Sequence, residues 1–131
     1  MGSDMTENDT LSGRTILVLE DEPLIAMDVE LALLDAGAQV LGPVGDERNA
    51  MAAIDAATRG GGTMGGAVLD VHLGQETCEN VAARLLGLKV PFVFHTGNLR
   101  DRDGFVARSG APIVRKPALT HELLTMLRGI V

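Results

Sequence analysis

The sequence contains no tryptophan and no tyrosine, and its only aromatic residues are three phenylalanines. Proteins that bind single-stranded nucleic acids stack bases on aromatic side chains, so a site of that class is not expected. Basic residues are also in the minority, because 11 Lys and Arg stand against 18 Asp and Glu, for a net charge of −7. This balance argues against nucleic acid as a direct partner.

Long hydrophobic runs and paired cysteines are missing as well. No apolar run approaches the roughly 20 residues of a membrane-spanning helix. The N-terminus also lacks the basic-then-apolar pattern of a secretory signal. Cys78 is the single cysteine, which excludes an internal disulfide framework and suits a reducing compartment. We therefore expect a cytoplasmic protein that does not bind membranes.

The length of 131 residues suits one domain with a sizeable core. Residues 1–13 are polar, show no periodic apolar pattern and begin Met-Gly-Ser. We interpret them as a disordered leader or an expression remnant. The folded domain is then expected over residues 14–131.

Short apolar segments alternate with helical patterns along this domain. The expected strands span residues 15–19, 39–44, 67–70, 91–94 and 111–114. The expected helices begin at Pro23, after Asp46, near Glu79 and at Thr120. This alternation predicts an α/β fold, in which a doubly wound parallel sheet is covered by helices on both faces.

Two of the helical segments carry more specific predictions. In the first helix, apolar residues recur at helical spacing and are expected to pack into the core: Leu24, Met27, Leu31 and Leu34. Residues 99–110 have few apolar anchors and are interrupted by Gly104 and Gly110, so a helix there would be short and weakly held. We expect residues 99–110 to be mobile and to respond to a partner.

Polar residues stand where the expected strands end: Glu20, Asp21, Asp70, Thr96 and Lys116. In doubly wound sheets, ligands bind outside the carboxyl ends of the strands. Carboxylates gathered there repel one another, and a divalent cation, with Mg²⁺ favoured by oxygen ligands, would relieve the repulsion. A lysine and a hydroxyl suit an anion, so the set describes a phosphoryl site in which one carboxylate acts as the nucleophile.

Four short motifs carry a resemblance to a known family: Leu19-Glu20-Asp21-Glu22-Pro23, Leu69-Asp70-Val71, Thr96-Gly97 and Lys116-Pro117. Together they resemble the receiver domain of bacterial two-component response regulators, over about residues 14–131. The resemblance implies a flavodoxin-like sheet of five parallel strands in the order 2-1-3-4-5. It also implies a phosphorelay signalling switch, and not a metabolic enzyme.

The resemblance also implies a role for each site residue. Asp70 would accept a phosphoryl group from a histidine kinase or a phosphotransfer protein. Mg²⁺ would be held by the side chains of Glu20, Asp21 and Asp70 and by the backbone carbonyl of His72. Three residues would bind the phosphoryl group: Thr96, Gly97 and Lys116.

Residues 91–97 further resemble the receiver subfamily named for a Phe-Ala-Thr-Gly motif, with His95 in place of the alanine. That subfamily is partnered with HWE-type histidine kinases, and its fourth helix is often poorly ordered. Ile113, three residues before Lys116, stands where an aromatic switch residue is common in the wider family.

Two alternatives from other functional classes stay open. One is a Mg²⁺-dependent phosphotransfer or nicking enzyme with an acidic doubly wound site. Such enzymes often need a second acid two residues after the first, and His72 stands at that position after Asp70. The other is an interaction module that works without phosphorylation, against which the intact acid cluster and Lys116 count.

Overall fold

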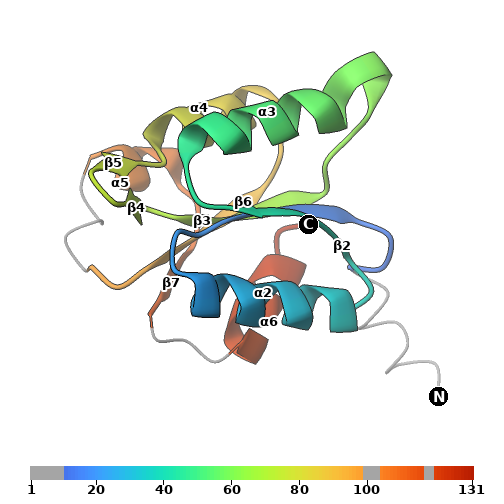
Figure 1. Cartoon of the computed structure of the whole chain (residues 1–131), viewed down its shortest axis with the longest axis horizontal. Coiled ribbons are helices and arrows are strands. Elements are labelled where there is room, and N and C mark those ends of the chain that lie inside the picture. The colour runs from blue at the N-terminus through green and yellow to red at the C-terminus, as the bar shows by residue number, and fades with distance from the viewer. Residues whose placement is uncertain (1–10, 99–103, 117–119) are drawn as a thin grey trace.

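The computed structural model describes residues 11–98, 104–116 and 120–131. It contains a five-stranded parallel sheet with helices on both faces (Figure 1). The strand order is β2-β1-β3-β6-β7. Counting only these five strands along the chain, this is the 2-1-3-4-5 order of a doubly wound fold, so the predicted fold class is confirmed.

The strands of this sheet are β1 (Thr15–Leu19), β2 (Gln39–Val44), β3 (Gly66–Asp70), β6 (Phe92–Thr96) and β7 (Ile113–Arg115). Strand β3 lies at the centre and is buried along its whole length, which agrees with its apolar residues before the terminal Asp70. Strand β2 lies at an edge, the place in a sheet where a proline such as Pro43 is tolerated. A separate two-stranded hairpin, which the sequence analysis did not predict, is formed by β4 (His72–Leu73) and β5 (Glu76–Thr77).

The helices form two layers, one on each face of the sheet (Figure 1). Helices α2 (Pro23–Asp35) and α6 (Thr120–Arg128) cover one face, and α3 (Glu47–Thr58), α4 (Glu79–Gly87) and the short α5 (Phe105–Ser109) cover the other. A 3₁₀ turn, η1 (Arg59–Gly61), follows α3. Within the described ranges, none of the helices is long and apolar enough to cross a membrane.

Helix α2 corrects the prediction of its buried face. The residues expected in the core are exposed: Leu24 by 74%, Met27 by 48%, Leu31 by 58% and Leu34 by 50%. Its buried residues lie on the opposite side of the helix: Ala26, Val29 and Leu33. Because α2 is apolar on both sides, helical spacing alone did not decide which side faces the sheet.

The N-terminal boundary also differs from the prediction. Leu11 is fully buried in the core beneath α2 and α6. The amide of Gly13 donates to the carbonyl of Gly37 at 2.9 Å. Residues 11–13 therefore pack with the domain and do not form part of a leader, while residues 1–10 lie outside the described ranges.

The segment expected to be weakly held is described only from residue 104 onward, and residues 99–103 lie outside the described ranges. Helix α5 has five residues and lies between Gly104 and Gly110, both of which have positive φ. Val106 is buried, and the ring of Phe105 packs edge-on against Phe94 with centroids 6.0 Å apart. A short helix is thus present, and its response to a partner stays a prediction.

Candidate functional site

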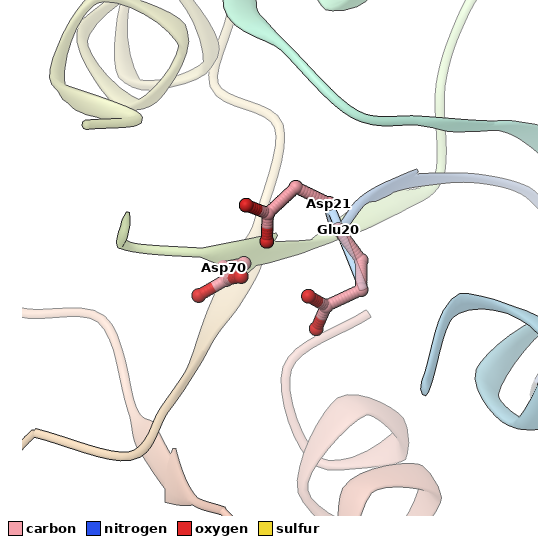
Figure 2. Close-up of side chains that lie close together, drawn as sticks. All are labelled: Glu20, Asp21 and Asp70. Carbon is pink, nitrogen blue, oxygen red and sulfur yellow. The ribbon is translucent and has the colours of Figure 1, made fainter. Parts of the chain in front are cut away.

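Three carboxylates meet at the carboxyl end of the central strands. Glu20 and Asp21 directly follow β1, and Asp70 is the last residue of β3. One oxygen from each lies within 4.8 Å of the others, and Figure 2 shows the three side chains gathered where β1 and β3 end. Glu20 and Asp70 are buried, whereas Asp21 is exposed, so the cluster opens to solvent on one side.

Lys116, which follows β7, reaches into this cluster. Its Nζ lies 2.9 Å from Glu20 Oε1, 3.2 Å from Asp70 Oδ2 and 3.6 Å from Glu22 Oε1. Its backbone amide donates to the carbonyl of Thr96 at 2.7 Å, which ties it to the end of β6. The partly buried Lys116 lies between two buried carboxylates and balances part of their charge, and the exposed Asp21 adds a further negative charge.

The environment shifts the pKa values of this group. Burial, followed by hydrogen bonding and repulsion from Glu20, raises the pKa of Asp70 to about 8, although Lys116 acts in the opposite direction. For Lys116, burial lowers the pKa, but the contacts with Glu20 and Asp70 outweigh burial and raise it overall. Lys116 therefore stays charged, and Asp70 holds a proton near neutral pH unless another cation joins the site.

Backbone amides of the β4–β5 hairpin hold two of the carboxylates. The amide of Gly74 donates to Asp21 Oδ2 at 3.1 Å, and the amide of His72 donates to Asp70 Oδ1 at 3.3 Å. Gly74 opens the two-residue hairpin loop with a φ of 66°, which favours glycine. Sequence reasoning missed this contact, although a glycine four residues after the strand-end Asp70 is a turn signal.

The remaining predicted site residues lie near the same edge of the sheet. Thr96 is the last residue of β6 and is buried, and its Oγ1 accepts a hydrogen bond from the amide of Asn98 at 3.2 Å. The β3–β6 register pairs Asp70 with His95, which places Thr96 one residue beyond Asp70 on the neighbouring strand. The phosphoryl-binding roles of Thr96 and Gly97 and the metal-binding role of the His72 carbonyl stay predictions.

His95, the residue that stands in place of the alanine of the Phe-Ala-Thr-Gly motif, is a further buried residue at this edge. Its side chain is 5% exposed, and neither ring nitrogen has a hydrogen-bond partner among the described residues. Burial and the charge of Lys116 lower the pKa of His95, while Glu20 acts in the opposite direction. The imidazole is therefore neutral, and it borders the charged cluster.

The donor set fits a hard divalent cation. All three candidate side-chain ligands are carboxylate oxygens, which suit Mg²⁺, Ca²⁺ or Mn²⁺ better than a metal that prefers nitrogen or sulfur. Glu20, Asp21 and Asp70 are the residues that would hold it. Lys116 Nζ lies 3.2 Å from Asp70 Oδ2, so the lysine and a cation held by the carboxylates would together offer two positive groups to an incoming anion, beside a carboxylate that could react with it.

No protein-family model matches the chain. One curated protein is 32% identical over 124 residues, the transcriptional regulatory protein TcrA of Mycobacterium tuberculosis. The matched part is 92% of this chain and 47% of TcrA. The chain thus spans about half the length of the curated relative that it matches.

Solved structures with the same fold include several response regulator receiver domains. A CheY-like receiver domain from Methanospirillum hungatei has a TM-score of 0.75 at 20% identity, over 90% of this chain and 93% of that one. A receiver protein from Sinorhizobium medicae has a TM-score of 0.73 at 27% identity, over 91% and 94%. The response regulator TrrA from Thermotoga maritima, in complex with Mg²⁺ and BeF, has a TM-score of 0.74 at 19% identity, over 88% and 97%. The chain therefore has the receiver-domain fold.

Proposed function

We propose that the chain is a phosphoacceptor module that takes a phosphoryl group onto Asp70 in a Mg²⁺-dependent reaction and acts as a two-component signalling switch. The contact that carries the proposal is the one between Lys116 Nζ and Asp70 Oδ2, at 3.2 Å, beside three carboxylates within 4.8 Å of one another. Similarity to a transcriptional regulator and the fold shared with TrrA, solved with Mg²⁺ and BeF, support it.

In this proposal, Glu20, Asp21 and Asp70 hold Mg²⁺ together with the backbone carbonyl of His72. The bound ion supplies charge neutralisation for the phosphoryl oxygens. An oxygen of the deprotonated Asp70 attacks phosphorus, and the bond from phosphorus to the donor imidazole nitrogen breaks. The electron pair of that bond stays on the imidazole nitrogen, and an acyl phosphate is formed.

Other residues then hold the transferred group. Lys116 already lies at Asp70 Oδ2 and would pair with a phosphoryl oxygen. The Thr96 hydroxyl and the Gly97 amide would donate hydrogen bonds to further oxygens, from the strand next to Asp70. Because these donors come from β6 and β7, phosphorylation would draw both strand ends towards β3.

The phosphoryl donor would be a histidine kinase or a phosphotransfer protein. The Phe-His-Thr-Gly segment at residues 94–97 favours an HWE-type kinase, through its resemblance to the Phe-Ala-Thr-Gly subfamily. His95 fills the position of the alanine with a buried imidazole, so this chain differs from the subfamily pattern inside the site. The donor itself is best identified by phosphotransfer from purified candidate kinases.

The decisive experiment uses acetyl phosphate and Mg²⁺, with the intact protein weighed by mass spectrometry. We expect one phosphoryl adduct on the wild-type chain, none on Asp70→Asn, and an unchanged adduct on Asp55→Asn. Asp55 is a matched control because it is an exposed carboxylate on α3 that forms an ion pair with Arg84 on α4.

Each other outcome contradicts the proposal in a distinct way. A full adduct on Asp70→Asn would move the acceptor to another residue. Consumption of an unrelated phosphate ester without an adduct would favour the Mg²⁺-dependent enzyme. A wild-type mass that never changes would favour an interaction module that works without phosphorylation.

A further inference from the structure

His95 is a buried polar side chain for which the function proposed above has no use. Within the part of the chain that the structure describes, neither of its ring nitrogens has a hydrogen-bond partner. A buried polar atom that lacks a partner costs stability, and a native structure that keeps one calls for an explanation. A second state of the protein in which the imidazole gains a partner would provide that explanation.

The strand register places His95 beside the candidate phosphoryl acceptor. On β6, His95 is paired with Asp70 of β3 on one side and with Val114 of β7 on the other. Val114 and Val93, which is two residues before His95, belong to the core beneath α2 and α6. Because side chains alternate between the faces of a sheet, the imidazole lies on this same face, next to the strand that carries Asp70.

Lys116 crosses the end of β6 on this face of the sheet. Its backbone amide is bound to the carbonyl of Thr96 on β6 at 2.7 Å, and its Nζ lies 3.2 Å from Asp70 Oδ2 on β3. Lys116 is two residues after Val114, so its side chain leaves the strand on the side that carries His95. The charge of Lys116 lowers the pKa of His95, second only to burial, so the ammonium group and the imidazole are within electrostatic reach of each other.

The present partners of Lys116 are the groups that the proposed reaction would engage. Glu20 Oε1 lies 2.9 Å from Nζ, and both Glu20 and Asp70 are candidate ligands of the cation. Glu22 Oε1, at 3.6 Å, belongs to an exposed side chain, and exposed ion pairs contribute little. If Glu20 turns to a cation and Asp70 carries a phosphoryl group, the ammonium group loses carboxylate oxygens as partners. One phosphoryl oxygen does not use all three of its N–H donors.

We propose that His95 is a positioning residue of the phosphorylated chain, and that its unprotonated ring nitrogen then accepts a hydrogen bond from the Lys116 ammonium group. This inference rests on the function proposed for Asp70. A neutral imidazole has one acceptor nitrogen, and an ammonium group can donate to it and to a phosphoryl oxygen at the same time. His95 thus holds Lys116 at the phosphoryl group, a role that the alanine of the Phe-Ala-Thr-Gly pattern could not fill.

The direct test observes the imidazole nitrogens of the whole chain by ¹⁵N nuclear magnetic resonance. The phosphoryl group is replaced by beryllium fluoride, added together with Mg²⁺, and the chain with a chelator is the reference state. We expect the signal of the unprotonated His95 nitrogen to move to lower frequency when both are added, as it does when such a nitrogen accepts a hydrogen bond. The signals of His121, an exposed residue of α6, should stay in place.

Variants measure what the hydrogen bond contributes. At saturating Mg²⁺, His95→Leu should weaken the binding of beryllium fluoride by about tenfold, because the bond involves a charged donor. His95→Gln supplies a side-chain oxygen as acceptor and should retain most of the wild-type affinity. His121→Leu, the control, should not change it. Titrations followed by ¹⁹F nuclear magnetic resonance give these affinities.

A merely structural role of His95 predicts a different pattern. Without ligand, His95→Leu should be at least as stable as the wild type, because it removes two buried nitrogens that lack partners. A stable variant that binds beryllium fluoride less tightly therefore separates positioning of Lys116 from support of the fold. Should His95→Leu fail to fold, the wild-type nitrogen signals and His95→Gln still decide the question.

The outcomes that overturn the proposal are distinct from those that overturn the proposed function. Beryllium fluoride that binds while the His95 signals stay unchanged, or while only the protonated nitrogen responds, overturns the role of His95 alone. Wild-type affinity in His95→Leu does the same. If the wild-type chain neither binds beryllium fluoride nor forms an adduct with acetyl phosphate, the function proposed for Asp70 is overturned, and the role of His95 with it.

Discussion

Lys116 Nζ lies 3.2 Å from Asp70 Oδ2 although β7 and β3 are not neighbours in the sheet. Strand β6 separates them, so the lysine side chain crosses the end of that strand to reach the central one. The same ammonium group lies 2.9 Å from Glu20 Oε1 at the end of β1. One side chain thus links the carboxyl ends of β7, β3 and β1.

The raised pKa of Asp70 predicts a pH-dependent stability change. The pKa of Asp70 is about 8 in the folded chain, against an ordinary value of 3.8. Between these pH values the folded state binds more protons than the unfolded state. The free energy of unfolding therefore falls as the pH rises from about 4 to about 8. Asp70→Asn removes the buried ionisable carboxyl group. At pH 8 the substitution should therefore raise the free energy of unfolding by on the order of 1–3 kcal/mol.

The measurement is urea denaturation from pH 5 to pH 8. The increase in the free energy of unfolding caused by Asp70→Asn should be smallest at pH 5 and should grow as the pH rises. Asp55→Asn serves as the control, because Asp55 pairs with Arg84 at an exposed position. Parallel pH profiles for the wild type and Asp70→Asn would contradict the raised pKa.

Addition of Mg²⁺ should stabilise the chain by binding linkage. A ligand that binds only the folded state at 100 times its dissociation constant adds about 2.7 kcal/mol. The stabilisation by Mg²⁺ should become smaller as the pH falls from 8 to 6, because the cation competes with the proton on Asp70. Melting curves with Mg²⁺ and with a chelator measure this, and Asp21→Asn should remove most of the shift. Identical melting temperatures in both conditions would contradict a metal site at the acid cluster.

The strand-end residues of the site were predictable from sequence because each follows a short apolar segment. Glu20, Asp70 and Lys116 stand at such places, and parallel strands bring their carboxyl ends to one edge. The buried side of α2 was not predictable in this way, since both sides are apolar. The role of Gly74 depends on a hairpin only two residues long in each strand, which carries almost no periodic signal.

His95 predicts a second pH effect, of opposite sign. Burial lowers the pKa of His95 below its ordinary value of 6.5, so the unfolded state binds the proton more readily and stability falls as pH drops below about 6.5. His95→Leu should remove this loss. It should also stabilise the chain by about 1 kcal/mol, because two buried nitrogens without partners are replaced by apolar atoms.

This effect is read as the difference between the unfolding free energies of His95→Leu and the wild type, from pH 5 to pH 7.5. The difference should be largest at pH 5. His72→Gln is the matched control, because His72 is exposed. A difference that does not change with pH would contradict a lowered pKa at His95.

Glu47 predicts a stability effect away from the site. Its carboxylate accepts hydrogen bonds from the amide of Val81 at 2.7 Å and from the side chain of Asn80 at 3.1 Å, at the first turn of α4. Glu47→Ala should therefore lower the free energy of unfolding by about 1–2 kcal/mol. Arg48→Ala, at an exposed position on the same helix, should change it far less. Equal effects of the two substitutions in urea denaturation would show that the capping contact adds nothing.

The contact of Glu47 with α4 also marks a limit of sequence reasoning. The start of α3 after Asp46 was predictable, because a helix cap is local: Asp46 is the N-cap, and its side chain accepts from the amide of Asn49 at 2.8 Å. The bond from Val81 joins residues 34 positions apart. Only the packing of α3 against α4 brings Glu47 and Val81 together, so no spacing pattern in the sequence predicts the contact.

The last prediction concerns the link between Thr96 and residues 99–110. The Thr96 hydroxyl oxygen accepts from the amide of Asn98 at 3.2 Å, directly before this segment. A hydroxyl that turns to donate to a phosphoryl group on Asp70 would weaken that bond and displace Asn98. Downstream, α5 has only five residues, with Phe105 and Val106 as its apolar anchors. A segment with few buried contacts opens at low free energy, so a small displacement should change its exchange rates.

Amide hydrogen exchange with and without phosphorylation tests this directly. We expect protection in residues 104–110 to change on phosphorylation, while α3 on the same face of the sheet stays constant. Thr96→Ser keeps the hydroxyl and should keep the change, whereas Thr96→Val removes the hydroxyl and should lose it without abolishing the adduct on Asp70. A change of equal size in Thr96→Val would mean that phosphorylation reaches α5 by a route other than the Thr96 hydroxyl. High and identical protection in both states of the wild type would show that α5 does not respond at all.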